Sequence, residues 1–123
     1  MLNKLLIVED DRIIADTLAI ILRKRGFDCY VAYSAGEAIS LSQSDCPDLI
    51  LADISLPDGT GLSVVSNITA RCPQCRVILL TGRYSNLQAA REWVHSHATV
   101  ARILTKPLLP ALLLQEVDEI LQG

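Results

Sequence analysis

The sequence predicts an α/β domain built on a doubly wound, five-stranded parallel sheet with helices on both faces. Five short apolar runs, each too short for a helix, alternate with five segments whose apolar residues recur at helical spacing. Each connection between parallel strands crosses one face of the sheet, so this alternation places helices on both faces. The length of 123 residues predicts one domain, residues 1–123, with a single core.

The expected strands are apolar runs bounded by turn-forming or charged residues. We place them at residues 4–8, 28–32, 49–52, 76–80 and 100–105. The third run, LILA, lies between Pro47 and the turn-forming Pro57-Asp58-Gly59, and we expect it to be a buried central strand. It ends at Asp53. Because an unpaired carboxylate beside apolar neighbours costs several kcal/mol unless something compensates it, Asp53 is a candidate for chemistry.

The expected helices begin or end at recognisable local signals. We place them at residues 12–25, 34–44, 61–71, 85–97 and 110–121. Gly26 follows the first helix, where a C-terminal glycine is expected, and Asp11 adds charge to its first turn. Ser34 and Glu37 have the spacing of a capping box, and Pro110 occupies the first turn of the last helix.

Composition and charge limit the classes of function. Half of the residues are hydrophobic, a fifth are charged, and the net charge is -3, which is typical of a soluble globular domain without general affinity for nucleic acid or anionic membranes. The sequence has neither a signal-peptide pattern nor an apolar run approaching ~20 residues, so we expect a cytoplasmic location.

The expected strand ends bring polar side chains to the carboxyl edge of the sheet, where ligands bind in open α/β folds. These residues are Glu9, Asp10, Asp53, Thr81 and Lys106. Three converging carboxylates repel one another, so they should be partly protonated or hold a cation, and oxygen ligands suit Mg²⁺ or Mn²⁺. A metal beside an exposed carboxylate, a lysine and a hydroxyl predicts phosphoryl transfer to the carboxylate itself, with Asp53 as nucleophile.

Four motifs carry these residues: IVEDD, LADISLPDGTG, LLTG and ILTKP. In this order and spacing they resemble the receiver domain of two-component response regulators, and the resemblance runs from Lys4 to the C-terminus. It implies a flavodoxin-like sheet with strand order 2-1-3-4-5. It also implies a domain that signals by phosphorylation-dependent protein contacts. Such a domain promotes its own phosphorylation and dephosphorylation but is not a turnover enzyme.

The resemblance assigns a role to each site residue. Asp53 would accept a phosphoryl group from a phosphohistidine on a sensor histidine kinase or phosphotransfer protein, Thr81 would move to bond that group, and Lys106 would pair with it. The implied Mg²⁺ ligands are the carboxylates of Glu9, Asp10 and Asp53 and the backbone carbonyl of Ser55.

Two features depart from the family pattern. Ile103 occupies a position where the fifth strand usually carries a Tyr or Phe that reports phosphorylation. The segment between Thr81 and Lys106 is longer than usual, and residues 95–99 replace the customary Ala-Gly turn. Both changes concern the route of the output signal and leave the phosphorylation chemistry intact.

The last helix carries more apolar residues than one buried stripe needs. We expect Leu113, Val117, Ile120 and Leu121 to face the sheet. The surplus residues are Leu108, Leu109, Leu112 and Leu114. Some should stay exposed on the face of the fourth helix, fifth strand and fifth helix, where the family resemblance implies a homodimer or effector contact. Alternatively, these leucines pack under the preceding loop.

The four cysteines are irregularly spaced, and we expect reduced thiols. Cys72-Pro73-Gln74-Cys75 has the CxxC spacing of redox and zinc sites, but it falls at the edge of the sheet remote from Asp53. A structural zinc would need further ligands, and Cys46 is the only other residue whose expected place is geometrically possible. We therefore expect no redox or metal function there.

Other functions on the same topology fit the residues less well. A flavodoxin-like mononucleotide binder needs a hydroxyl- and glycine-rich loop after the first strand, where Glu9-Asp10-Asp11 would repel a phosphate. A haloacid-type phosphatase places its nucleophile on the first strand, with another acid two positions later. A degenerate receiver that serves only for docking would have lost part of this intact set of site residues.

Overall fold

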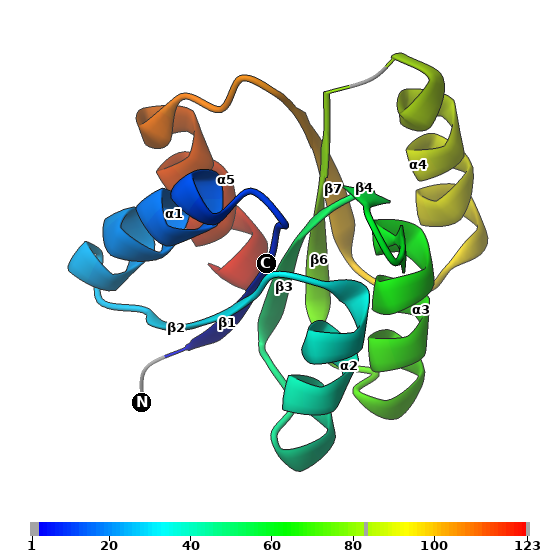
Figure 1. Ribbon diagram of the computed structural model, residues 1–123, viewed down its shortest axis with the longest axis horizontal. Helices are drawn as coiled ribbons and strands as arrows, with labels where there is room; N and C mark the ends of the chain where they lie inside the picture. The colour runs from blue at the N-terminus through cyan, green and yellow to red at the C-terminus, as the bar shows by residue number, and fades with distance from the viewer. Residues whose placement is uncertain (1–2, 83, 123) are drawn as a thin grey trace.

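A computed structural model describes residues 3–82 and 84–122 of the chain (Figure 1). The strands of the main sheet are β1 (Lys4–Val8), β2 (Asp28–Ala32), β3 (Leu49–Asp53), β6 (Arg76–Thr81) and β7 (Ala101–Thr105). The helices are α1 (Arg12–Lys24), α2 (Ala35–Ser44), α3 (Gly61–Arg71), α4 (Tyr84–Ser96) and α5 (Pro110–Gln122). A separate antiparallel pair consists of β4 (Ser55–Leu56) and β5 (Gly59–Thr60).

The main sheet of the described chain is parallel, with strand order β2-β1-β3-β6-β7. This confirms the expected fold class and the expected order 2-1-3-4-5, because β4 and β5 lie outside the main sheet and only shift the numbering. The register pairs Val8 with Ala32 and Ala52, and pairs Thr81 with Thr105. The strands therefore end together, and the residues that follow them share one edge.

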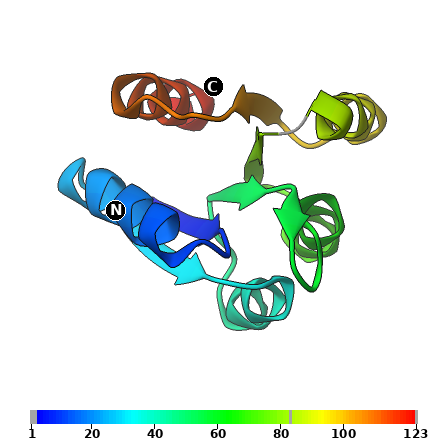
Figure 2. The same cartoon turned by 45° about the horizontal axis from the view of Figure 1, so that its top comes forward.

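Helices cover both faces of this sheet, with α1 and α5 on one side and α2, α3 and α4 on the other (Figures 1 and 2). Alternate strand residues enter different cores: Leu5 and Ile7 pack on the α1 and α5 side, whereas Leu6 and Val8 pack on the opposite side. Every residue of β3 is buried, which confirms the prediction of a buried central strand. None of the helices within residues 3–82 and 84–122 is long and apolar enough to cross a membrane.

Local signals set most of the helix ends. Gly26 follows α1 with a φ of +104°, a left-handed conformation that glycine adopts without strain. The Ser34 side chain accepts a hydrogen bond from the Glu37 backbone N–H at 3.2 Å, which confirms this half of the capping box. Asp11 has a different place from the one expected: it is the N-cap of α1 and accepts the N–H groups of Ile13 and Ile14 at 3.1 and 3.2 Å.

The turn after β3 has a tertiary role that its local sequence did not reveal. Asp58 lies between β4 and β5, and its carboxylate accepts the backbone N–H groups of Ala35 and Gly36 at 2.9 and 3.1 Å. These hydrogen bonds lower the pKa of Asp58. Asp58 thus joins the segment after the phosphoacceptor candidate to the N-terminus of α2, where a negative charge is favourable.

The expectation that all four cysteines are reduced is wrong for one pair. Cys46 and Cys72 form a disulfide with a Cα–Cα distance of 5.7 Å, within the usual range for such a bond. Cys46 precedes β3, and Cys72 caps the C-terminal end of α3, so the bond closes a loop of sequence separation 26 around Asp53. A chain-entropy estimate for this loop length is roughly 3–4 kcal/mol of stabilisation. Cys29 and Cys75 are free and buried.

Candidate functional site

Backbone hydrogen bonds fix the positions of the candidate residues beyond the strand ends. The Glu9 N–H donates to the Ala32 carbonyl at 3.0 Å, and the Lys106 N–H donates to the Thr81 carbonyl at 2.9 Å. Asp53 is the last residue of β3 and is paired in register with Leu80. The sheet therefore brings these side chains to the same edge by its regular backbone pairing, as the sequence predicts.

The three carboxylates form a compact cluster at this edge. One oxygen from each of Glu9, Asp10 and Asp53 lies within 4.8 Å of the others. Glu9 is 1% exposed and Asp53 is 7% exposed, whereas Asp10 is exposed. The expectation of an exposed phosphoacceptor carboxylate is thus wrong, because the neighbouring strand ends and Lys106 cover most of Asp53.

Lys106 holds the cluster together. Its Nζ donates to Asp53 Oδ2 at 2.7 Å and to Glu9 Oε1 at 3.2 Å. Burial alone would lower the pKa of Lys106, but the hydrogen bond and the charge of Asp53, with those of Glu9, raise it. The ammonium therefore stays charged beside the carboxylates. The peptide bond between Lys106 and Pro107 is cis.

The pKa values of the two buried carboxyl groups are shifted in opposite directions. Burial, followed by the hydrogen bond and charge of Asp53, raises the pKa of Glu9 to about 8. Burial also acts to raise the pKa of Asp53, but hydrogen bonds with Glu9, Lys106 and the Ser55 backbone lower it overall. The lowered pKa favours the ionised form of Asp53, which is the form that a carboxylate nucleophile requires.

The donor set fits a hard divalent cation. Glu9 Oε2 is buried and has no hydrogen-bond partner among the described residues, so it is an oxygen that lacks compensation in the protein alone. Carboxylate oxygens of Asp10 and Asp53 lie within 4.8 Å of a carboxylate oxygen of Glu9, and all the candidate donors are oxygens. Mg²⁺ prefers such ligands, and a cation would relieve the repulsion between these groups.

Ser55 connects the site to α4. Its backbone N–H donates to Asp53 Oδ1 at 3.0 Å, and its side-chain oxygen accepts a hydrogen bond from Asn86 Nδ2 at 2.8 Å. Sequence reasoning missed Asn86, because residues 31 positions apart carry no local signal of their contact. The hydrogen bond links the first turns of α4 directly to the segment that follows Asp53.

Gly61, the first residue of α3, was also missed as a residue of the site. Its N–H donates to the Ile54 carbonyl at 2.8 Å, so the helix begins against the backbone that follows Asp53. A Cβ added to Gly61 would lie 2.1 Å from the Asp53 carbonyl oxygen and 2.9 Å from Ile54 Cα. Any larger residue would therefore displace α3 or the phosphoacceptor candidate.

We expect Gly61→Ala to lower the free energy of unfolding by about 1–3 kcal/mol, the usual cost of forcing atoms into a packed site. Urea denaturation measures this loss. Gly59→Ala is the matched control, because its added Cβ would meet Ala35 Cβ at an ordinary 3.6 Å. Equal stability losses in the two variants would show that the close approach at Gly61 is unimportant.

Thr81 and Ile103 complete the region. Thr81 is 2% exposed at the end of β6, and the pairing of β6 with β7 places it beside Thr105. Ile103 is half-buried and packs against the core under α2, α3 and α4. Its aliphatic side chain is therefore part of the core packing.

The surplus leucines near α5 divide between the two expected arrangements. Leu113, Val117 and Ile120 are buried, as expected. Leu108, Leu114 and Leu121 are partly buried against the same core. Leu109 and Leu112 are 65% and 43% exposed. Part of the surplus apolar surface is thus available on the molecule.

Comparisons with known proteins place this chain in a family. Residues 5–118 match the family described as the response regulator receiver domain. A CheY-like receiver domain protein from Methanospirillum hungatei has 30% sequence identity and a TM-score of 0.89, with 99% of this chain and 95% of that chain covered. The chain belongs to the response regulator receiver family.

Two more distant structures share the fold. The chemotaxis protein CheY4 of Vibrio cholerae has 22% identity and a TM-score of 0.86, with 98% of this chain and 99% of that chain covered. NtrX from Brucella abortus has 24% identity and a TM-score of 0.87, with 99% of this chain but 27% of that chain covered. The same fold therefore occurs both in a short chain and as part of a longer protein. Receivers are phosphorylation-accepting signalling domains that typically bind Mg²⁺.

Proposed function

We propose that Asp53 accepts a phosphoryl group from a phosphohistidine on a sensor histidine kinase or phosphotransfer protein. The observation that carries this proposal is the 2.7 Å contact between Lys106 Nζ and Asp53 Oδ2 within the cluster of three carboxylates. An ionised carboxylate, a fixed cation and a group of oxygen donors are what phosphoryl transfer to a carboxylate requires.

Residues of this chain perform distinct parts of the transfer. A carboxylate oxygen of Asp53 bonds to phosphorus while the P–N bond to the partner's histidine breaks, and the leaving imidazole keeps the electron pair. Lys106 neutralises charge on the transferring group, and the Thr81 hydroxyl donates a hydrogen bond to one of its oxygens. Lys106 and Thr81 keep the same protonation state throughout the transfer, so both act by their position.

Glu9, Asp10, Asp53 and the backbone carbonyl of Ser55 would hold Mg²⁺, and Mn²⁺ would substitute for it. When bound, the metal neutralises charge on the phosphoryl oxygens. The donors match the preference of Mg²⁺ for oxygen, and the unpartnered Glu9 Oε2 is available to it. The same acidic cluster argues against a phosphate-binding loop of the flavodoxin type, because buried carboxylates repel a phosphate.

The surface beside Lys106 supports docking of a helical partner. A groove of about 570 Å³ lies between α1 and the start of α5, and its lining includes Ile13, Ile14, Leu108 and Lys106. Ile13 is 80% exposed. A phosphohistidine carried on a partner's helix could reach Asp53 while apolar residues of that helix fill this groove.

Output would use the face formed by α4, β7 and α5. Leu109 and Leu112 expose apolar surface there, which favours a homodimer or an effector contact that phosphorylation strengthens. Phosphorylation would act through movement of Thr81 and of the Ser55–Asn86 connection, because Ile103 has no polar group to report it.

We also propose that residues 1–123 form one receiver domain that acts in the cytoplasm as a signalling domain rather than a turnover enzyme.

Phosphorylation by a small donor tests this function. With acetyl phosphate and Mg²⁺, the intact mass of the protein should rise by one phosphoryl group, because this chain supplies the nucleophile and the charge-neutralising groups. Asp53→Asn removes the nucleophile while keeping its shape and should show no gain. An equal gain in Asp53→Asn would place the acceptor elsewhere and contradict the proposal.

A further inference from the structure

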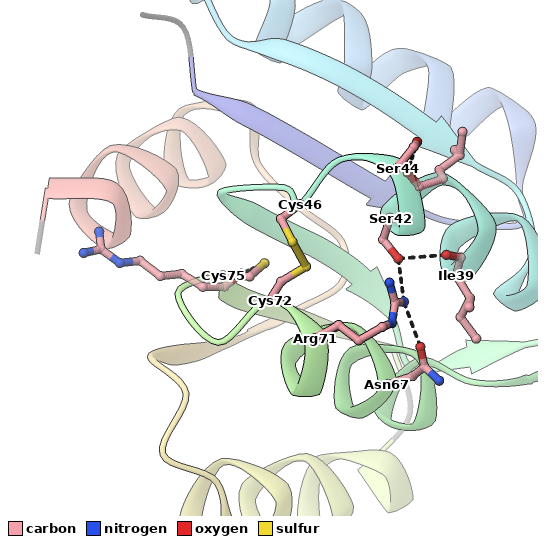
Figure 3. Close-up of a disulfide and its surroundings, with 10 residues drawn as sticks. Ile39, Ser42, Ser44, Cys46, Asn67, Arg71, Cys72 and Cys75 are labelled. Carbon is pink, nitrogen blue, oxygen red and sulfur yellow. Dashed lines mark hydrogen bonds between the residues drawn. A yellow bond between two sulfur atoms is a disulfide. The ribbon is translucent and has the colours of Figure 1, made fainter.

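The cysteines near the amino edge of the sheet form a cluster that phosphorylation does not use. Figure 3 shows the disulfide Cys46–Cys72 and the neighbouring free Cys75. These cysteines line one hollow of about 320 Å³, together with Pro47, Asp48, Pro73 and Gln74. The strands run from this edge toward Asp53, so the hollow and the phosphoacceptor candidate lie at opposite ends of β3. A change at the cysteines can therefore occur without contact with the acidic cluster.

The two cysteines of the disulfide differ in exposure. Cys46 is exposed in the loop that joins α2 to β3, whereas Cys72 is 3% exposed at the end of α3. Thiol–disulfide exchange requires the attacking thiolate to reach one sulfur and the other sulfur to leave. Cys46 is the more exposed residue of the pair, so we expect an external thiol to attack on its side of the bond.

Cys75 is unsuited to exchange with the disulfide. Its side chain is 3% exposed, and its S–H donates to the Arg76 carbonyl at 3.3 Å. Burial, with a smaller contribution from the charge of Asp48, raises the pKa of Cys75 to about 12. The thiolate is the nucleophile, so a thiol that remains protonated at neutral pH does not attack. The CxxC pair Cys72 and Cys75 is thus not the redox pair.

A second connection holds α2 and α3 together when the disulfide opens. Arg71, next to Cys72, donates from Nη2 to Ser42 Oγ in α2 and to Asn67 Oδ1 in α3, both at 2.9 Å (Figure 3). Ser42 is 2% exposed and also donates to the Ile39 carbonyl. This network lies between the helices, so reduction should loosen their ends without separating them.

We propose that Cys46–Cys72 is a reversible redox modification site, which a dithiol reduces by attack on Cys46. One thiolate of the dithiol bonds to Cys46 Sγ, the Cys46–Cys72 bond breaks, and Cys72 leaves as a thiolate that takes up a proton. The second thiol of the dithiol then displaces Cys46. The products are two cysteine thiols and an oxidised dithiol, so two electrons pass from the dithiol to the protein disulfide.

The cellular location of the protein determines what this disulfide can respond to. Disulfides in reducing compartments are usually transient and redox-sensing, so a disulfide on a cytoplasmic receiver would respond to the thiol pool. This step rests on the cytoplasmic location proposed above, whereas the chemistry of the site does not. Reduction would release the tether between the loop at residues 45–48 and the C-terminal turn of α3.

Thiol counting on the native protein tests the proposal. The folded protein is incubated with dithiothreitol at neutral pH without denaturant, the reductant is removed, and the protein is unfolded in iodoacetamide. The untreated protein should take up two labels, on Cys29 and Cys75, and the treated protein four. Removal of the reductant followed by mild oxidation should restore two labels and a peptide crosslinked between Cys46 and Cys72.

Two variants and hydrogen exchange separate the redox site from alternatives. Cys46→Ser should take up three labels both before and after reduction. Cys75→Ala should take up one label before reduction and three after it, the same increase of two as the parent. Amide exchange at Cys72, whose N–H donates to the Ile68 carbonyl at 2.8 Å, should be at least about tenfold faster after reduction. Exchange near Asp53 should not change, so this result is independent of whether Asp53 is phosphorylated.

Several outcomes would overturn the proposal. A disulfide that is reduced only after the protein unfolds is a structural crosslink and not a modification site. A crosslinked peptide that contains Cys75 would show that the redox pair is a different one. Four free thiols with bound zinc in the purified protein would identify the cluster as a metal site.

Discussion

Saturating Mg²⁺ should raise the thermal midpoint of this protein, and Asp10→Ala should abolish the response. A ligand that binds only the folded state at 100 times its dissociation constant adds about 2.7 kcal/mol of stability. For a domain of this size, the midpoint then rises by roughly 10 °C. Asp10 is the exposed member of the cluster, so its removal disturbs packing least while taking away a proposed ligand.

Calorimetry or thermal scanning with and without Mg²⁺ measures this effect. Glu92→Ala is the matched control, because Glu92 is an exposed acid on α4 that takes no part in the acidic cluster. The control should keep the full Mg²⁺ response. If Mg²⁺ raises the thermal midpoint of Asp10→Ala as much as that of the parent, the acidic cluster is not the metal site.

Lys106→Met should slow phosphorylation by about 10²- to 10³-fold, the usual effect of removing one group that stabilises developing charge. Methionine keeps an unbranched apolar stem and removes only the ammonium, which contacts both Asp53 and Glu9. The loss should therefore appear in the rate of phosphoryl gain from acetyl phosphate, measured by intact mass at saturating Mg²⁺.

Lys4→Met provides the control for charge. Lys4 pairs with Asp45 on the surface at the amino edge of the sheet, so its removal changes the net charge equally without touching the cluster. The control should be phosphorylated at the parent's rate. If Lys106→Met were also phosphorylated at the parent's rate, the result would contradict a role for the ammonium in the transfer.

Much of the architecture could be predicted because its signals are local. The run from Leu49 to Ala52 is apolar on both faces and bounded by turn-forming residues, and it is the fully buried β3. Gly26 and Ser34 act at helix ends where their own sequence neighbours specify the geometry. The site could be assembled from sequence for a related reason, since parallel strands in register end at one edge.

Other features depend on contacts between distant residues and had no local signal. Asp58 has the sequence of a turn residue, yet its carboxylate contacts the N-terminus of α2, which is 22 and 23 positions away. The pairing of Cys46 with Cys72 depends on how the loop before β3 lies against the end of α3. The burial of Asp53 was also misjudged, because its position at a strand end does not reveal how closely Lys106 covers it.

The most direct test of the proposed function is to locate the phosphoryl group. After reaction with acetyl phosphate and Mg²⁺, borohydride reduces an aspartyl phosphate to homoserine, and tandem mass spectrometry finds the modified position. We expect homoserine at residue 53 and unchanged aspartate at residues 10, 11 and 58. Homoserine at another position, or a phosphoryl group on a serine, threonine or histidine, would contradict the assignment of Asp53 as the phosphoacceptor.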